Sequence, residues 1–351
     1  MKSLFSILFF IIVSLSFVSC VNNDKKTDTG DGKLSIVATI FPQYDWIKQI
    51  LGENVSDVNL TLLFNSGVDL HSYQPTVEDI VKISDCDMFV YVGGESDKWV
   101  KDVLKNAANK NMKTINLMEV LGDSVKEEET VEGMQTDEHH HHHEHAKEDK
   151  EHAHKHEHEH DKDCDHNHDE EETEYDEHVW LSLKNAVIFV QKIADTLGEI
   201  DKENADTYIM NANSYIKELS SLDKAYSNNV NSASEKTVVF ADRFPFRYLT
   251  DDYGLKYYAA FSGCSAESEA SFETIIFLAN KIDELGLNTV LTIEGKEHKI
   301  AETVIKNTKS KNQKIAVMDS MQSTTLKDVE TGTTYLSVME QNLKTLSEAL
   351  K

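Results

Sequence analysis

Residues 34–51 read LSIVATIFPQYDWIKQIL, a short β-rich run that turns directly into a helical pattern. The first seven residues are mostly apolar and include β-branched types, as in a buried strand. Beyond them, apolar side chains recur at helical spacing, at Trp46, Ile47 and Ile50. The stretch therefore predicts a strand followed by a helix, the opening of a βαβ unit.

The same alternation continues along the chain. Further strands are predicted at 55–64, 88–94 and 112–120, with helices at 76–84 and 97–110 between them. A second half repeats the pattern, with a strand–loop–helix over 236–255, strands at 255–261, 288–295 and 313–321, and helices at 271–286, 297–310 and from 334 onward. Strands that alternate with helices indicate a largely parallel sheet in each half.

A long helical pattern lies between the halves. It starts at Asp201, which we expect to be its cap, and runs to about Tyr226. About 25 helical residues span nearly 40 Å, which is longer than a small domain needs. We therefore expect an α/β protein of two similar lobes, 34–200 and 237–351, with a helix over 201–228 that braces them.

A histidine- and acid-rich tract interrupts the first lobe, within a loop predicted to be disordered over about 124–176. Thirteen of the chain's sixteen histidines lie between His139 and His168, interleaved with Asp and Glu. Imidazole and carboxylate groups are ligands for zinc and other transition metals. A solvated acidic loop is the alternative, whereas an expression tag is a plain histidine run at a terminus. The composition favours a loop that contacts metal ions.

The charge of the chain is concentrated in this tract. The formal net charge is −27, and residues 137–177 hold 18 acids against 4 lysines, a net of −14. The rest of the chain is moderately acidic. Binding to nucleic acid through phosphates requires a basic surface, so this composition argues against such a partner. An acidic surface favours cations.

The N-terminal 20 residues, MKSLFSILFFIIVSLSFVSC, have the pattern of a signal peptide. The apolar run from Leu4 to Val18 is too short to span a bilayer comfortably. Cys20 at its end resembles the cysteine of a bacterial lipobox, so we expect it to be lipidated and followed by a polar tether over 21–33. This predicts a protein anchored on the extracytoplasmic face of a bacterial membrane.

The other cysteines are scattered. Cys86, Cys164 and Cys264 are odd in number and far apart, so they predict neither a disulfide framework nor a cysteine zinc cage. Cys86 has the surroundings of a buried core residue, and Cys164 in the tract is placed to assist metal capture.

Two histidines outside the tract lie in loops of folded sequence. His71 follows the second predicted strand, in VDLHSYQP, and His178 lies just beyond the tract, in DEHVWLSL. Ligands of parallel sheets bind outside the carboxyl ends of the strands, and His71 falls on that side. A surface or satisfied loop histidine is the alternative for each.

Four segments carry a clear resemblance to a known family. They read VATIFPQYDWIKQILGENV, VDLHSYQPTVEDIVKISDCDMFVYVGG, DEHVWLSLKNA and DDYGL. In this order they resemble the solute-binding lipoproteins of bacterial zinc and manganese ABC importers, over nearly the whole chain from Leu34. The histidine-rich insertion is typical of the zinc members. The resemblance implies two α/β lobes joined by one long helix, with a metal cleft between the lobes.

Carried over residue by residue, the resemblance implies that His71 and His178 are metal ligands. Histidines that coordinate must be neutral. The remaining histidine outside the tract, His298, lies in a helical stretch and is expected to be an ordinary surface residue.

The second lobe departs from the family pattern. Ala241 stands where the resemblance places a histidine or a glutamate, and alanine cannot coordinate. Either Asp242, the next residue, takes the place of the missing ligand, or the site has fewer protein ligands and keeps a water. The resemblance implies a further second-lobe ligand at an acid that maps to Asp319, and Glu294 is a neighbouring acid at a comparable strand end. The candidate acids are therefore Asp319, Glu294 and Asp242. Their alternative roles are, in that order, a helix N-cap, a partner that orients a histidine, and an ion pair with Arg243.

The expected function is capture of zinc and delivery to an ABC permease and its ATPase, by a monomer that is not an enzyme. Two histidines with two carboxylates suit zinc or manganese, and the histidine tract favours zinc. The alternatives are a manganese receptor and a surface metal buffer or adhesin without transport. A zinc hydrolase has less support, because no HExxH or comparable motif is present.

Overall fold

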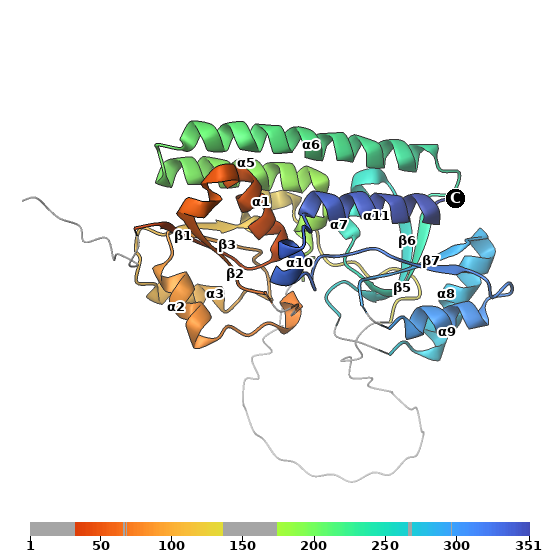
Figure 1. Ribbon diagram of the computed structural model, residues 1–351. Coiled ribbons are helices and arrows are strands. Elements are labelled where there is room, and N and C mark those ends of the chain that lie inside the picture. The colour runs from red at the N-terminus through yellow and green to blue at the C-terminus, as the bar shows by residue number, and fades with distance from the viewer. Residues whose placement is uncertain (1–31, 66, 68, 136–173, 266–268, 296) are drawn as a thin grey trace, which may run out of the picture. The chain divides into compact units, whose positions relative to one another are not determined.

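A computed structural model of the protein describes residues 32–351 except 66, 68, 136–173, 266–268 and 296 (Figure 1). Contact density divides the chain into a leading segment, Met1–Gly32, and one compact unit, Lys33–Lys351. The predicted signal peptide, Cys20, nearly all of the tether, and the histidine tract with Cys164 lie outside the described residues. Within the part that is described, no helix combines the length and the apolar character that a membrane crossing needs.

The first lobe is built on a parallel sheet with the strand order β2–β1–β3–β4. The strands are β1 (Leu34–Ala38), β2 (Val58–Leu62), β3 (Met88–Tyr91) and β4 (Lys113–Asn116). The helices are α1 (Phe41–Leu51), α2 (Val77–Asp85), α3 (Val100–Asn106) and α4 (Leu117–Leu121). The strand predicted at 112–120 ends early because Asn116 caps α4, its side chain accepting from the N–H of Glu119.

The second lobe repeats this topology strand for strand, in the order β6–β5–β7–β8, again all parallel. Its strands are β5 (Thr237–Phe244), β6 (Lys256–Ser262), β7 (Thr289–Thr292) and β8 (Lys314–Val317). Its helices are α7 (Arg247–Tyr253), α8 (Phe272–Leu285), α9 (Lys299–Asn307), α10 (Leu326–Glu330) and α11 (Tyr335–Ala349). The predicted two-lobe α/β architecture is confirmed. Because the orders match, β6 is the counterpart of β2.

Two long helices, α5 (Leu183–Ile200) and α6 (Ala205–Ser232), run side by side, and α6 extends along both lobes (Figure 1). The 28 residues of α6 span about 42 Å, and α6 contacts α1 of the first lobe and α7 and α11 of the second. The predicted bracing helix is therefore present. The predicted cap is wrong: Asn204 is the N-cap, while Asp201 ends α5 and accepts hydrogen bonds from Asn204 and Tyr208.

One hydrophobic cluster runs through both lobes. At its centre Trp46 of α1 packs against Phe189 of α5 and Tyr335 of α11, at ring-centroid distances of 5.7 and 5.1 Å. Tyr335 also donates its backbone N–H to Asp45 (2.9 Å) and its hydroxyl to the carbonyl of Trp180 (2.7 Å). All are buried, so apolar packing and satisfied hydrogen bonds hold the lobes together.

The two ends of the predicted disordered loop are ordered parts of the fold. Glu127 and Tyr175 form an antiparallel bridge, and the N–H of Asp176 donates to the carbonyl of Lys126 (2.9 Å). Nearer to the tract, on its N-terminal flank, the N–H of Gln135 donates to the carbonyl of Ala260 in β6 (2.9 Å). The predicted disordered loop, about 124–176, is therefore too long at both ends, because residues on its two flanks form hydrogen bonds with each other and with β6.

Candidate metal centre

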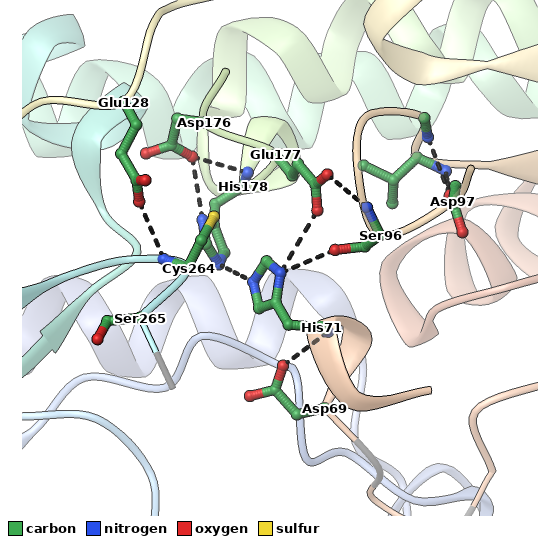
Figure 2. Close-up of polar contacts among 12 residues, drawn as sticks. Asp69, His71, Ser96, Asp97, Glu128, Asp176, Glu177, His178, Cys264 and Ser265 are labelled. Carbon is green, nitrogen blue, oxygen red and sulfur yellow. Dashed lines mark hydrogen bonds and ion pairs between the residues drawn. The ribbon is translucent and has the colours of Figure 1, made fainter. Parts of the chain in front are cut away.

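Among the described residues, one group of three metal-ligating side chains comes together: His71, His178 and Cys264. One ligand atom from each lies within 4.8 Å of the others. Figure 2 shows the two imidazole rings facing each other, with the sulfur of Cys264 beside His178. The histidines belong to the first lobe, and Cys264 follows β6 of the second.

His71 is held by contacts on both its backbone and its ring. It lies in a single 3₁₀ turn, Leu70–Ser72, which Asp69 caps by accepting from the N–H of His71 (3.0 Å). Its Nδ1 atom faces the hydroxyl of Ser96 (2.8 Å) and Oε2 of Glu177 (3.5 Å). Ser96 is itself fixed, since its N–H donates to Oε1 of Glu177 (2.9 Å). These contacts aim Nε2 of His71 at His178.

His178 is completely buried, and Asp176 makes two contacts with it, one to the backbone and one to the ring. Oδ1 of Asp176 accepts from the backbone N–H of His178 (2.8 Å) and lies 3.0 Å from its Nδ1. Asp176 in turn is fixed by the hydroxyl of Tyr248, which donates to its carbonyl (2.9 Å). A carboxylate at Nδ1 is the arrangement that orients histidine ligands of metals, because it leaves the lone pair on Nε2.

The two Nε2 atoms are 3.3 Å apart. Two nitrogen ligands on one tetrahedral zinc ion, each about 2.0–2.1 Å from the metal, are separated by about 3.3–3.4 Å. Burial, followed by the neighbouring His178, lowers the pKa of His71 to about 4, so its imidazole is neutral at neutral pH. The histidine pair therefore has the spacing that zinc requires, and His71 has the neutral form that coordination needs.

Cys264 is partly buried in the turn after β6. Its backbone N–H donates to Oε1 of Glu128 (3.1 Å), in the segment that precedes the tract. Burial, and then the acids Glu128 and Asp176, raise the pKa of its thiol well above the usual range. We did not predict a role for Cys264 from the sequence. The available signal was its position: Cys264 follows β6, and β6 is the counterpart of β2, the strand that precedes His71.

The three acids predicted as ligands are not members of this group. The carboxylate of Asp242 accepts from the N–H groups of Arg243 (2.9 Å) and Ile293 (3.3 Å). Asp319 accepts from the N–H of Met321 (2.7 Å), and its pKa rises to about 7 because it is buried, next to Glu294. The geometry adds no support to Asp242 or Asp319 as ligands, and their assignment stays a prediction.

Glu294 fixes the turn that follows β8. Its carboxylate accepts from the N–H and the hydroxyl of Ser320 (both 2.7 Å) and from the N–H of Gln322 (3.2 Å). These bonds occupy both oxygens of Glu294, whose role as a metal ligand also stays a prediction.

Ala241 and Arg243 explain how the second lobe departs from the expected pattern. Ala241 is 1% exposed and packs in a separate core cluster with Val239 and Leu278, so it serves packing. Arg243 faces the first lobe instead, and its Nη2 donates to Oδ2 of Asp69 (2.8 Å). Burial disfavours the charged form of Asp69, but Arg243 and the N–H of His71 outweigh it and lower its pKa. The ion pair links β5 to the turn that carries His71.

Comparisons with known proteins show the family of this chain. The family model described as zinc-uptake complex component A, periplasmic (ZnuA), matches residues 36–349. The zinc-binding lipoprotein AdcA of Streptococcus pneumoniae is 32% identical over 346 residues, 98% of this chain and 60% of that protein. The high-affinity zinc uptake system protein ZnuA of Bacillus subtilis is 29% identical over 338 residues, 96% of this chain and 94% of that protein.

The fold agrees as well. The crystal structure of Zn(II)-bound AdcA from Streptococcus pneumoniae matches with a TM-score of 0.66 and 30% identity, over 91% of this chain and 58% of that chain. The chain thus spans about 60% of the length of the AdcA relatives. The family model covers nearly all of the compact unit, including both facing histidines. The chain belongs to the ZnuA family of periplasmic zinc-uptake complex components.

Proposed function

We propose that this protein captures zinc outside the cytoplasm and hands it to an ABC permease and its ATPase. The observation that carries the proposal is the pair of imidazoles, with Nε2 atoms 3.3 Å apart and Nδ1 atoms facing acceptors. His71 and His178 are the first-lobe ligands. The named relatives are zinc-binding and zinc-uptake proteins, which supports zinc as the cargo.

The site favours zinc over manganese. Manganese prefers oxygen ligands, whereas imidazole suits zinc. None of the three acids predicted as ligands belongs to the group around the histidines, so the donors that would suit manganese are not assembled there. Metal capture followed by release is a binding function, and the family is a transport component.

The histidine tract and the anchor complete the proposal. A tract whose two ends are fixed beside the site would raise the local zinc concentration there by weak binding. Lipidation at Cys20 would hold the monomer at the membrane surface near its permease, and relatives named lipoproteins support this anchor.

Calorimetric titration of zinc and manganese tests the proposal, in a protein that lacks residues 1–20 and 138–170. We expect one tight zinc site and weaker manganese binding, with the tight site lost in His71→Ala and in His178→Ala. His298→Ala is the matched control and should bind like the parent. Tight manganese with weak zinc would change the cargo, and no tight site in the parent would overturn the proposal.

A further inference from the structure

The second lobe brings a sulfur atom close to the histidine pair. Sγ of Cys264 lies within 4.8 Å of the ligand nitrogens of both His71 and His178. On a tetrahedral zinc ion, a thiolate about 2.3 Å from the metal and an imidazole about 2.0–2.1 Å away are separated by about 3.6 Å. A closing movement of about 1 Å therefore brings all three atoms into one coordination shell.

The surroundings hold Cys264 in this place. Glu128 accepts its backbone N–H (3.1 Å), and Nη1 of Arg243 donates to the carbonyl of the next residue, Ser265 (3.5 Å). Gly263 lets the turn approach the ring of His178: a Cβ at this position would be 2.9 Å from Cε1 and 3.0 Å from Nδ1. Three separate features thus bring this turn against the histidine pair.

The topology of the lobes gives the same result. His71 follows β2, and Cys264 follows β6, its counterpart in the second sheet. Each sheet therefore contributes a donor from the carboxyl end of its equivalent edge strand, where ligands of parallel sheets bind. Cys86, the other thiol among the described residues, is fully buried at the end of α2 and bonded to the carbonyl of Ile83 (3.2 Å).

We propose that Cys264 is the zinc ligand of the second lobe, which completes a His–His–Cys donor set with His71 and His178. This inference rests on the proposed zinc-binding function and names the residue that determines its specificity. On binding, the S–H bond breaks, the proton leaves to solvent, and a zinc–sulfur bond forms. Thiolate is a soft ligand that favours zinc and disfavours manganese, so Cys264 sets the choice of metal.

Cobalt(II) is the probe for this ligand, because a thiolate bound to cobalt gives a near-ultraviolet charge-transfer band that nitrogen and oxygen ligands do not give. The reference protein starts at residue 21 and carries Cys164→Ser, so that Cys86 and Cys264 are its thiols. We expect the band in the reference and in Cys86→Ser at the first equivalent of cobalt, and its loss in Cys264→Ser. Circular dichroism checks that each variant is folded.

A second measurement leaves Cys264 itself unchanged. One equivalent of zinc should slow the alkylation of Cys264 by iodoacetamide in the reference protein. Mass spectrometry of the peptide that contains Cys264 measures the rate.

Cys264→Asp should lower zinc affinity by more than the roughly 10–100-fold typical of residues that only orient a ligand, and should raise the affinity for manganese relative to zinc.

The outcomes separate this inference from the proposed function. A tight zinc site that needs His71, with no charge-transfer band and no protection of Cys264, would overturn the cysteine ligand and leave zinc capture intact. A reference protein without any tight site for zinc or cobalt would overturn both. A band that survives in Cys264→Ser would place the sulfur ligand elsewhere and refute the assignment.

Discussion

At the scale of single residues, Glu177 contacts His71 on the side of the ring away from Nε2, the nitrogen proposed to bind the metal. Glu177 is 2% exposed, and its Oε2 lies 3.5 Å from Nδ1 of His71 with no other hydrogen-bond partner. Burial raises the pKa of Glu177, whereas the hydrogen bonds from Ser96 act in the opposite direction. A buried acceptor placed only against the far nitrogen of a ligand fits the role of orienting that ligand.

Glu177→Gln is therefore expected to lower zinc affinity by roughly 10–100-fold without unfolding the protein. The amide can still accept from Ser96 but can place an N–H against Nδ1 of His71, which disfavours the metal-binding tautomer. Calorimetry measures the loss, and Glu199→Gln, at an exposed glutamate paired with Lys113, is the control. Equal affinities in both variants would show that Ser96 alone orients His71.

Gly263→Ala tests the close approach of the second lobe. The added methyl group would be 2.9 Å from Cε1 of His178 and 3.0 Å from the carbonyl of Phe244, so either the ring or the turn must shift. We expect weaker zinc binding together with a loss of about 1–3 kcal/mol in the stability of the metal-free protein. Gly295→Ala is the matched control, since a Cβ there meets no atom within 4 Å. Equal zinc affinities in the two variants would argue against the observed spacing.

At the scale of elements, the turn after β3 carries Ser96 and is held by a buried acid. Asp97 is 4% exposed, and Oδ2 accepts from the N–H groups of Val92 and Gly93 (both 2.9 Å). Burial raises the pKa of Asp97 to about 7, the N–H of Gly93 opposes this, and nearby Glu177 adds to it. The turn that positions His71 thus contains a carboxyl group, that of Asp97, whose protonated form is favoured by the fold.

The sign of the pH dependence follows from this shift. The folded protein binds the proton of Asp97 more tightly than the unfolded chain, whose aspartates have pKa values near 4. The stabilisation is complete below about pH 4 and is lost as the pH rises through about 7. Asp97→Asn should therefore become more stable relative to the parent between about pH 5 and pH 8, as measured by urea unfolding of the metal-free proteins. A constant difference across that range would contradict the shift.

The elements also show which parts of the site the sequence could predict. Strands, helices and the two histidines follow from local periodicity and from motifs in continuous sequence. Cys264 does not, because it meets His71 only after both sheets have formed. The acids Asp242 and Glu294 remain predicted ligands at strand ends. The sequence did not show that their carboxylates also accept from the N–H groups of the turns after the strands.

At the scale of the whole molecule, the candidate ligands join the two lobes. His71 and His178 belong to the first lobe and Cys264 to the second, while α6, Trp46 and Tyr335 already hold the lobes together through a shared core. Because this core is closely packed, a wide hinge motion would have to disrupt buried contacts. The proposed His–His–Cys coordination shell needs only a small movement of the turn after β6. Zinc binding is therefore expected to stabilise the entire unit, Lys33–Lys351, as one cooperative structure.

This stabilisation can be measured as a shift in the free energy of unfolding. Free zinc at about 1,000 times the dissociation constant should add about 4 kcal/mol, provided that the unfolded chain binds none. The thirteen histidines of the tract can bind zinc in both the folded and the unfolded chain. At a fixed free zinc concentration this binding cancels, so deletion of residues 138–170 should leave the shift nearly unchanged. Urea unfolding in buffered zinc and in a chelator measures it, and His71→Ala with His178→Ala should abolish it. A zinc-induced shift that persists in that double variant would mean that the stabilising metal binds outside the histidine pair.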